Sequence, residues 1–245
     1  GVVGAIGAWV AYGWVWARSW GARWFNPSMQ PSARASSTTD ASAPIAFPEP
    51  RSGGGQVTIL TRRARVGVSG AHQRKPLEDS ALLVLGTGTA VLRSITLRTP
   101  AEHRHAGRTP PAELQLRFTA DEGAQVGIAV PIVPGPASAA LDDLERGILD
   151  VYGLLARPRE FAGYHGTETV PPFLDPMMWL VALTPATAGI AQIDRIVTAT
   201  ASGQRPLPPR ALQPSRGRPV VRLRAKVLIL RTGSSGAETG ELART

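Results

Sequence analysis

From Gln56 onward, the chain is a succession of short apolar runs rich in valine, leucine and isoleucine, and this pattern constrains the fold more than any other feature. Runs such as QVTIL, ALLVL, AELQLRF and VVRLRAKVLIL have the length and the composition of β-strands. One window, at 140–155, has leucine and isoleucine residues at a helical spacing. The sequence therefore predicts a mainly β domain over residues 56–231, with many strands and few helices.

The composition limits the number of domains and the chemistry that the chain can support. Its 245 residues, 43% of them hydrophobic, suit one domain with appendages better than two full domains. The absence of cysteine excludes disulfides and thiolate metal sites, so metal ligands would have to be histidine, aspartate or glutamate. A formal net charge of +9 is compatible with nucleic acid, anionic lipid or an acidic protein as partner.

The first 17 residues, GVVGAIGAWVAYGWVWA, carry no charge and are followed at once by Arg18. Tryptophan favours the membrane interface, and five of the six tryptophans lie in the first 24 residues, among them Trp9, Trp14, Trp16 and Trp20. We therefore expect residues 1–20 to form a transmembrane anchor in a lipid bilayer, with a secretory signal peptide as the alternative. Small residues four apart, such as Gly4 and Ala8, would let a neighbouring transmembrane helix approach closely.

Two further segments have the composition of linkers rather than of a folded core. Residues 21–55 contain ARASSTTDASAP and end near RSGGG, which predicts an extended linker. Residues 232–245 are polar and are expected to form a C-terminal tail. The predicted order is thus an anchor, a linker, one β domain and a tail.

Several motifs follow one another in an ordered series. They are PAEH at 100–103, AELQLRF at 112–118, GYHGTETVPP at 163–172, MMWLV at 177–181 and LQPSRGRPV at 212–220. This order resembles the α-type carbonic anhydrases, which carry segments like PSEH, AELHLVH, a tyrosine followed by GSLTTPPC, a WIV strand and a final QP…NGR. The resemblance spans roughly residues 43–225. It implies a large, twisted, mostly antiparallel central sheet with short peripheral helices.

In that family a zinc ion is held by three histidines, two from a strand that reads HFH and the third from AELHLVH. Residues two apart on a strand point to the same face, so the first two converge on one metal. The resemblance assigns the three ligand positions to Thr96, Arg98 and Gln115, so all three histidines are absent. At an effective dielectric near 20, Arg98 would also repel a divalent ion about 4 Å away by twice the ~4 kcal/mol of a unit pair. We therefore predict no zinc, no other cofactor and no carbonic anhydrase activity.

Five other positions of the resemblance keep the residue types that orient the ligands and the metal-bound hydroxide in the family. They are Glu102, His103, Glu113, Tyr164 and Thr169, which we interpret as structural hydrogen-bond partners in the sheet core. By the same resemblance, the proton-shuttling histidine is replaced by Ala64, two pocket valines by Arg117 and Gln125, and one threonine by Val170.

We also predict that an ion pair has replaced the metal. A guanidinium that points into a sheet-lined pocket must be neutralised or reach water. Arg98 is expected to pair with Glu113 or, failing that, with Glu102. Arg117 lies on the same strand face as Glu113 and is expected to compete for that carboxylate.

Two alternatives stay open. A zinc enzyme with relocated ligands would have to draw on His72, His103, His105 or His165, with Glu102 close by. Basic residues at 62–65 and 205–226 would suit an RNA-contacting subunit of an organellar ribosome. Aromatic residues that could stack on bases are missing from both basic regions, so nucleic acid is not the expected partner.

The favoured hypothesis is a non-catalytic, carbonic-anhydrase-like accessory subunit of a multi-subunit organellar membrane complex. Its expected partners are other subunits of that complex, including a neighbouring transmembrane helix, and the lipid bilayer. A respiratory complex of the mitochondrial inner membrane is the first expectation, and a photosynthetic complex of the thylakoid is the second. Arginines that follow the predicted anchor favour the matrix or stromal side for the globular domain.

Overall fold

The computed structural model describes residues 44, 50, 55–68, 73–120, 123–156, 159–169, 175–201, 211–213 and 219–230. The predicted anchor with its tryptophans, nearly all of the linker, the C-terminal tail, His72 and Val170 lie outside these residues. Among the helices in the described ranges, none has the length and apolar character needed to cross a bilayer.

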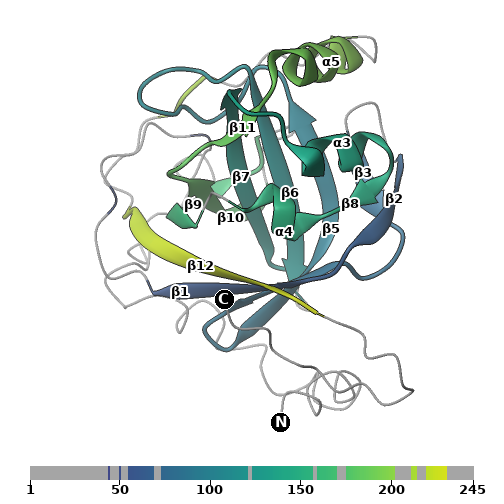
Figure 1. Ribbon diagram of the computed structural model, residues 1–245. Coiled ribbons are helices and arrows are strands. Elements are labelled where there is room, and N and C mark those ends of the chain that lie inside the picture. The colour runs from purple at the N-terminus through teal and green to yellow at the C-terminus, as the bar shows by residue number, and fades with distance from the viewer. Residues whose placement is uncertain are drawn as a thin grey trace, which may run out of the picture.

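The prediction of a mainly β domain with few, short helices is confirmed (Figure 1). The strands are β1 (Gln56–Thr61), β2 (Ala64–Val68), β3 (Gln73–Pro76), β4 (Ala81–Leu85), β5 (Gly88–Arg98), β6 (Ala112–Ala120), β7 (Gln125–Pro134), β8 (Ile148–Leu149), β9 (Glu160–Thr167), β10 (Pro176–Ala182), β11 (Ala186–Ala188) and β12 (Val221–Ile229). The helices are α3 (Ala139–Glu145), α4 (Val151–Leu154) and α5 (Ile190–Ala201).

The strands form one mixed sheet that closes on itself. Its path runs β7–β10–β9–β12–β1–β4–β5, and β6 pairs with both β5 and β7 to complete the circuit. Most neighbouring pairs are antiparallel, as predicted, whereas β1 with β12 and β7 with β10 and β11 are parallel. Closure leaves two faces, and alternate residues of each strand belong to different faces.

One face carries the main hydrophobic core. On β6, Leu114, Leu116 and Phe118 belong to this core, together with apolar residues from α3, α4 and α5. Figure 1 shows α3 and α4 lying across the central strands and α5 at one end of the sheet. The alternate β6 residues, Glu113 and Gln115 among them, therefore lie on the opposite face, and this alternation positions the candidate site.

The prediction of one continuous helix at 140–155 is wrong, because the structure has two short helices with a strand between them. α3 ends at Glu145, and Gly147 adopts a φ of 84°, a left-handed conformation that interrupts a helix. The next two residues form β8, where Leu149 pairs with Ala64 of β2, before α4 begins. Pairing with a distant strand thus overrides the local helical spacing. Helix α5 lies outside the predicted helical window altogether.

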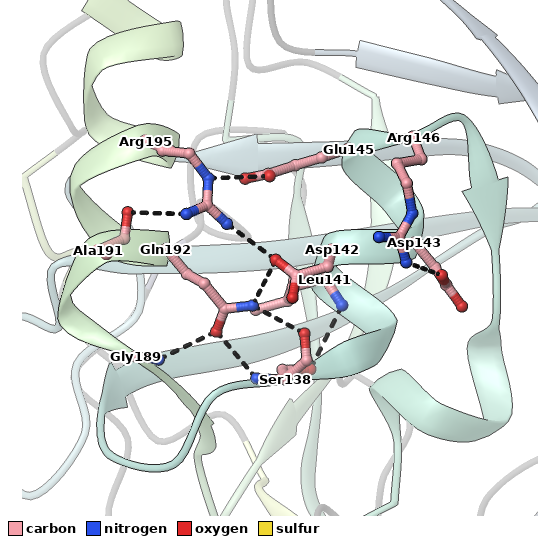
Figure 2. A network of polar contacts seen from close by, with 10 residues as sticks. All are labelled: Ser138, Leu141, Asp142, Asp143, Glu145, Arg146, Gly189, Ala191, Gln192 and Arg195. Atoms are coloured by element: carbon pink, nitrogen blue, oxygen red, sulfur yellow. Dashed lines mark hydrogen bonds and ion pairs between the residues drawn. The ribbon is translucent and has the colours of Figure 1, made fainter.

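A polar network fastens α5 to α3 (Figure 2). The buried Gln192 amide accepts hydrogen bonds from Ser138 N at 2.9 Å and Gly189 N at 3.0 Å. Its nitrogen donates to Ser138 O at 2.9 Å and to Asp142 Oδ1 at 2.7 Å. Arg195 of α5 adds ion pairs to Asp142 and Glu145 of α3. All four hydrogen-bonding positions of one buried amide are satisfied, which defines how the two helices pack.

Candidate functional site

The three expected ligand positions meet on one face of β5 and β6. Thr96 of β5 lies directly opposite Gln115 of β6, and Arg98 lies opposite Glu113. The alternate residues of β5, Ile95 and Leu97, face the main core. The structure therefore brings Thr96, Arg98 and Gln115 together, as the resemblance to the carbonic anhydrases implies.

Glu113 and His103 form a fully buried pair behind these positions. The backbone N–H of His103 donates to Glu113 Oε2 at 2.8 Å, and His103 Nδ1 lies 3.1 Å from Glu113 Oε1. On the other side of the ring, Nε2 lies 2.9 Å from the hydroxyl of Tyr164. Trp179 packs against the imidazole with 5.0 Å between ring centroids. The imidazole is therefore held by polar groups at both nitrogens.

The charge of Glu113 is stabilised in this enclosure. Burial by itself raises the pKa of the carboxyl group. The charge of His103 and hydrogen bonds from His103 and Gln115 outweigh that effect and hold the pKa of Glu113 below its usual range. Glu113 is thus a buried carboxylate whose negative charge depends on its neighbours.

Gln115 joins this pair to a second buried carboxylate. Its amide nitrogen donates to Glu113 Oε1 at 2.7 Å and to Glu102 Oε2 at 3.1 Å. A primary amide carries two N–H groups, so each carboxylate can receive one of them. We call this arrangement of Gln115, Glu102 and Glu113 the amide clamp.

Arg98 pairs with Glu102, and the first-choice prediction of a pair with Glu113 is wrong. Arg98 Nε lies 3.5 Å from Glu102 Oε1, which is the alternative that the sequence left open. Glu113 lies opposite Arg98 across the strands, but its oxygens are taken by His103 and Gln115. The Nε atom is buried and has no hydrogen-bond partner among the described residues, so the contact with Glu102 is an ion pair only.

The pKa of Glu102 is raised, whereas that of Glu113 is lowered. Burial raises the pKa of Glu102, and Arg98 and a hydrogen bond from Thr169 oppose this rise only in part. Ionised Glu102 therefore costs the folded state free energy, whereas ionised Glu113 stabilises it.

Arg117 does not compete for Glu113. Its Nη1 lies 2.5 Å from Glu168 Oε1, a residue that the sequence analysis did not single out. The Glu168 side chain is 9% exposed and that of Arg117 is 34% exposed, so the pair lies at the margin of the site. Two sequence features could have indicated this pair: Glu168 is adjacent to Thr169, and Arg117 carries its charge on the same strand face as Gln115.

The remaining predicted positions lie elsewhere. Ala64 is buried on β2 opposite Leu149 and has no group that could carry a proton. Gln125, at the start of β7, accepts a hydrogen bond from Thr119 at 3.1 Å. For the alternative of relocated ligands, His105 lies in a turn opposite Arg108 and His165 lies on β9. Within the described ranges, no three histidine, aspartate or glutamate residues gather as a metal site would require.

The residues at the ligand positions that the resemblance assigns do not fit zinc. Protein zinc sites use histidine, cysteine and carboxylate ligands, and Thr96, Arg98 and Gln115 offer a hydroxyl, a cation and an amide. The amide nitrogen of Gln115 donates both of its hydrogens toward carboxylates. The two carboxylates of the clamp are in turn engaged by this amide and by Arg98 and His103. The polar side chains at this site therefore bind one another rather than leaving a set of free metal ligands.

The closed mixed sheet with short helices is the fold of the α-carbonic anhydrases. Solved structures show this at low sequence identity: dioscorin complexed with ascorbate has a TM-score of 0.65 and 21% identity over 76% of this chain and 87% of its own. An α-carbonic anhydrase from Photobacterium profundum has a TM-score of 0.64 and 21% identity over 75% of this chain and 89% of its own.

The carbonic anhydrase Cah3 from Chlamydomonas reinhardtii, in complex with acetazolamide, has a TM-score of 0.61 and 20% identity over 76% of this chain and 91% of its own. No family model and no curated protein sequence matches the chain. The expected resemblance to the α-carbonic anhydrases is thus confirmed for the fold.

Proposed function

We propose that this protein is a non-catalytic subunit with a carbonic anhydrase fold, which serves an organellar membrane complex as an accessory or structural component. The observation that carries the first half of this proposal is the amide clamp. Gln115 stands at a ligand position of the fold and donates to Glu102 and Glu113 at 3.1 and 2.7 Å. Both N–H groups of Gln115 are thus directed at carboxylates, and a carboxamide is not among the histidine, cysteine and carboxylate ligands that zinc sites use.

Loss of zinc removes the chemistry that the fold supports in carbonic anhydrases. A zinc ion lowers the pKa of its bound water to about 7 and so generates hydroxide at neutral pH. Arg98 cannot take over this role, because a guanidinium has no vacant coordination site for the lone pair of a water molecule and, since it keeps its proton, cannot act as a general base. Without a hydroxide source, hydration of CO2 has no nucleophile at this face.

The pair of Arg117 and Glu168 supports the same conclusion. The resemblance places Arg117 where carbonic anhydrases have an apolar pocket residue for the substrate. Here the position carries a cation whose Nη1 lies 2.5 Å from a carboxylate oxygen. A small apolar molecule such as CO2 gains little from contact with such an ion pair.

The subunit role rests on the sequence. The uncharged, tryptophan-rich segment at 1–20 suits a membrane anchor, and its small residues suit contact with another transmembrane helix. A folded scaffold without a metal still offers broad surfaces for docking. A mitochondrial respiratory complex is the first candidate, and a thylakoid complex is the second.

Metal analysis tests the catalytic half of the proposal. The purified chain is expected to contain far less than one zinc per molecule, to keep its melting temperature in chelator and to leave CO2 hydration at the uncatalysed rate. An active α-carbonic anhydrase treated in parallel provides the control. Stoichiometric zinc or measurable hydration would contradict the proposal.

Isolation from native membranes tests the subunit half. The tagged full-length chain, extracted in mild detergent, is expected to co-purify with a fixed set of membrane proteins at constant stoichiometry. A chain that elutes alone from membranes would contradict this role and would leave the metal result untouched.

A further inference from the structure

A row of leucines crosses three neighbouring strands on the face opposite the main core. Leu228 of β12 lies beside Leu60 of β1, and Leu60 lies beside Leu82 of β4. Leu230 extends the row: its N–H donates to Thr61 O at 2.7 Å, and the residue is 39% exposed. We call Leu60, Leu82, Leu228 and Leu230 the leucine row.

The leucine row belongs to neither hydrophobic core. Its strand neighbours Ile59, Leu83 and Val227 are buried in the main core, so the row points the other way. Leu60, Leu82 and Leu228 are half-buried, and neither core cluster of the described residues includes them. Contiguous apolar side chains on the outside of a sheet mark an interaction site more often than isolated ones do.

The charged residues of β12 beside the leucine row are both positive. Lys226 and Arg224 precede Leu228 on the same face of β12, opposite Thr58 and Gln56 of β1. Strands β1, β4 and β12 contain no aspartate or glutamate. Glu160 of β9 contacts Arg224, whose side chain is still 79% exposed, and no carboxylate among the described residues forms an ion pair with Lys226. The face is therefore apolar at one end and cationic at the other.

These features favour one occupant over two others. A second copy docked through a two-fold axis near the cations would bring like charges together, and one docked through the leucines would offer the cations no acidic partner, because β1, β4 and β12 contain no carboxylate. A lipid surface would require apolar side chains that insert several ångströms into the acyl region. The leucines lie within the pleated face between neighbouring strands, which suits contact with a complementary protein surface instead.

We propose that the leucine row and the cations Arg224 and Lys226 form the docking surface for a protein segment with apolar side chains flanked by aspartate or glutamate. The apolar residues of the segment cover the leucines, and its carboxylates pair with Lys226 and Arg224. This inference rests on the proposed role as a subunit and names the surface that serves it.

The test uses the tagged full-length chain in its native membranes. Lys226→Glu reverses an exposed charge, and Leu60→Gln interrupts the centre of the leucine row. Each is expected to lower the yield of co-purified subunits about tenfold, which corresponds to ~1.4 kcal/mol of lost interface free energy. Arg93→Glu, the same reversal at an exposed residue of β5, is the matched control and is expected to leave the yield unchanged.

Melting temperatures separate docking from folding. Lys226 is exposed, so the melting temperature of Lys226→Glu is expected to equal that of the wild type. If Leu60→Gln does not fold, the result for Lys226→Glu decides the test. Undiminished co-purification of Lys226→Glu would overturn the inference and leave the subunit role standing. A wild-type chain without co-purifying subunits would instead overturn the subunit role.

A photo-crosslinking residue at position 228 identifies the occupant. The expected product is a peptide of another subunit that carries apolar residues with aspartate or glutamate within a few positions. A crosslink to lipid, to a second copy of the chain or to another segment of the same chain would overturn the inference, as would a partner peptide without acidic residues.

Discussion

Arg98 and Glu113 lie directly opposite each other on β5 and β6, and yet Arg98 forms its ion pair with Glu102. The reason lies in the amide clamp and in His103, which occupy the oxygens of Glu113. Carboxylates that surround a metal site in the carbonic anhydrase fold are here held by an amide, an imidazole and a guanidinium.

Replacing Gln115 with leucine should destabilise the fold strongly. The change leaves Glu102 and Glu113 without their shared donor, and an unsatisfied buried group costs about 1–3 kcal/mol, more when it is charged. We expect the free energy of unfolding in urea to fall by about 2–4 kcal/mol. Gln56→Leu, at an exposed glutamine of β1, is the matched control and should change stability little. An equal effect of both substitutions would show that the clamp contributes nothing specific.

The stability of the fold should depend on pH through Glu113. Its folded pKa is lowered, so the stabilisation that it provides is present above its unfolded pKa near 4.5 and is lost as the pH falls through the folded pKa. The difference in unfolding free energy between the wild type and Glu113→Gln should therefore shrink on acidification below about 4.5. Denaturation curves recorded from neutral to acidic pH measure this. A difference that grows toward low pH would contradict the assignment.

Glu102 should behave in the opposite way. Burial raises its pKa, so the folded state binds the proton more tightly than the unfolded chain, and stability falls as the pH rises from 4.5 through the folded pKa. Arg98→Met alone removes the countercharge of a buried carboxylate and should cost about 1–3 kcal/mol at neutral pH. The double variant Arg98→Met with Glu102→Gln should cost less than the sum of the two single changes. Additive effects would show that the 3.5 Å pair is not energetically coupled.

Gln192→Leu should loosen α5 without unfolding the sheet. The substitution removes four hydrogen bonds: three, with Ser138 and Asp142, connect α5 to α3, and the fourth comes from Gly189, directly before α5. Amide hydrogen exchange in α5 should become faster while exchange in β6 stays protected, because local opening can occur below the global unfolding free energy. Thr198→Leu, at an exposed position of α5, is the control. Uniform acceleration across β6 and α5 would indicate global destabilisation instead.

Part of this structure could be predicted from the sequence. Alternation of residue types in AELQLRF separates Leu114 and Leu116 from Glu113 and Gln115, and the structure places these pairs on opposite faces of β6. Local periodicity was enough because a strand exposes alternate residues to opposite sides wherever it lies. The order of the motifs also predicted the carbonic anhydrase fold and the positions at which Thr96, Arg98 and Gln115 meet.

Only the tertiary structure decided which side chains bind one another. Glu168 reaches Arg117 from a distant strand end, and Gly147 interrupts a helical pattern so that Leu149 can pair with Ala64. Such contacts depend on strand register and on loop paths, which no local pattern contains. The sequence by itself determined that three histidines are absent. The tertiary structure determined that the Gln115 amide lies between the carboxylates of Glu102 and Glu113. The reason is that buried polar groups need hydrogen-bond partners, and the fold decides which partners are within reach.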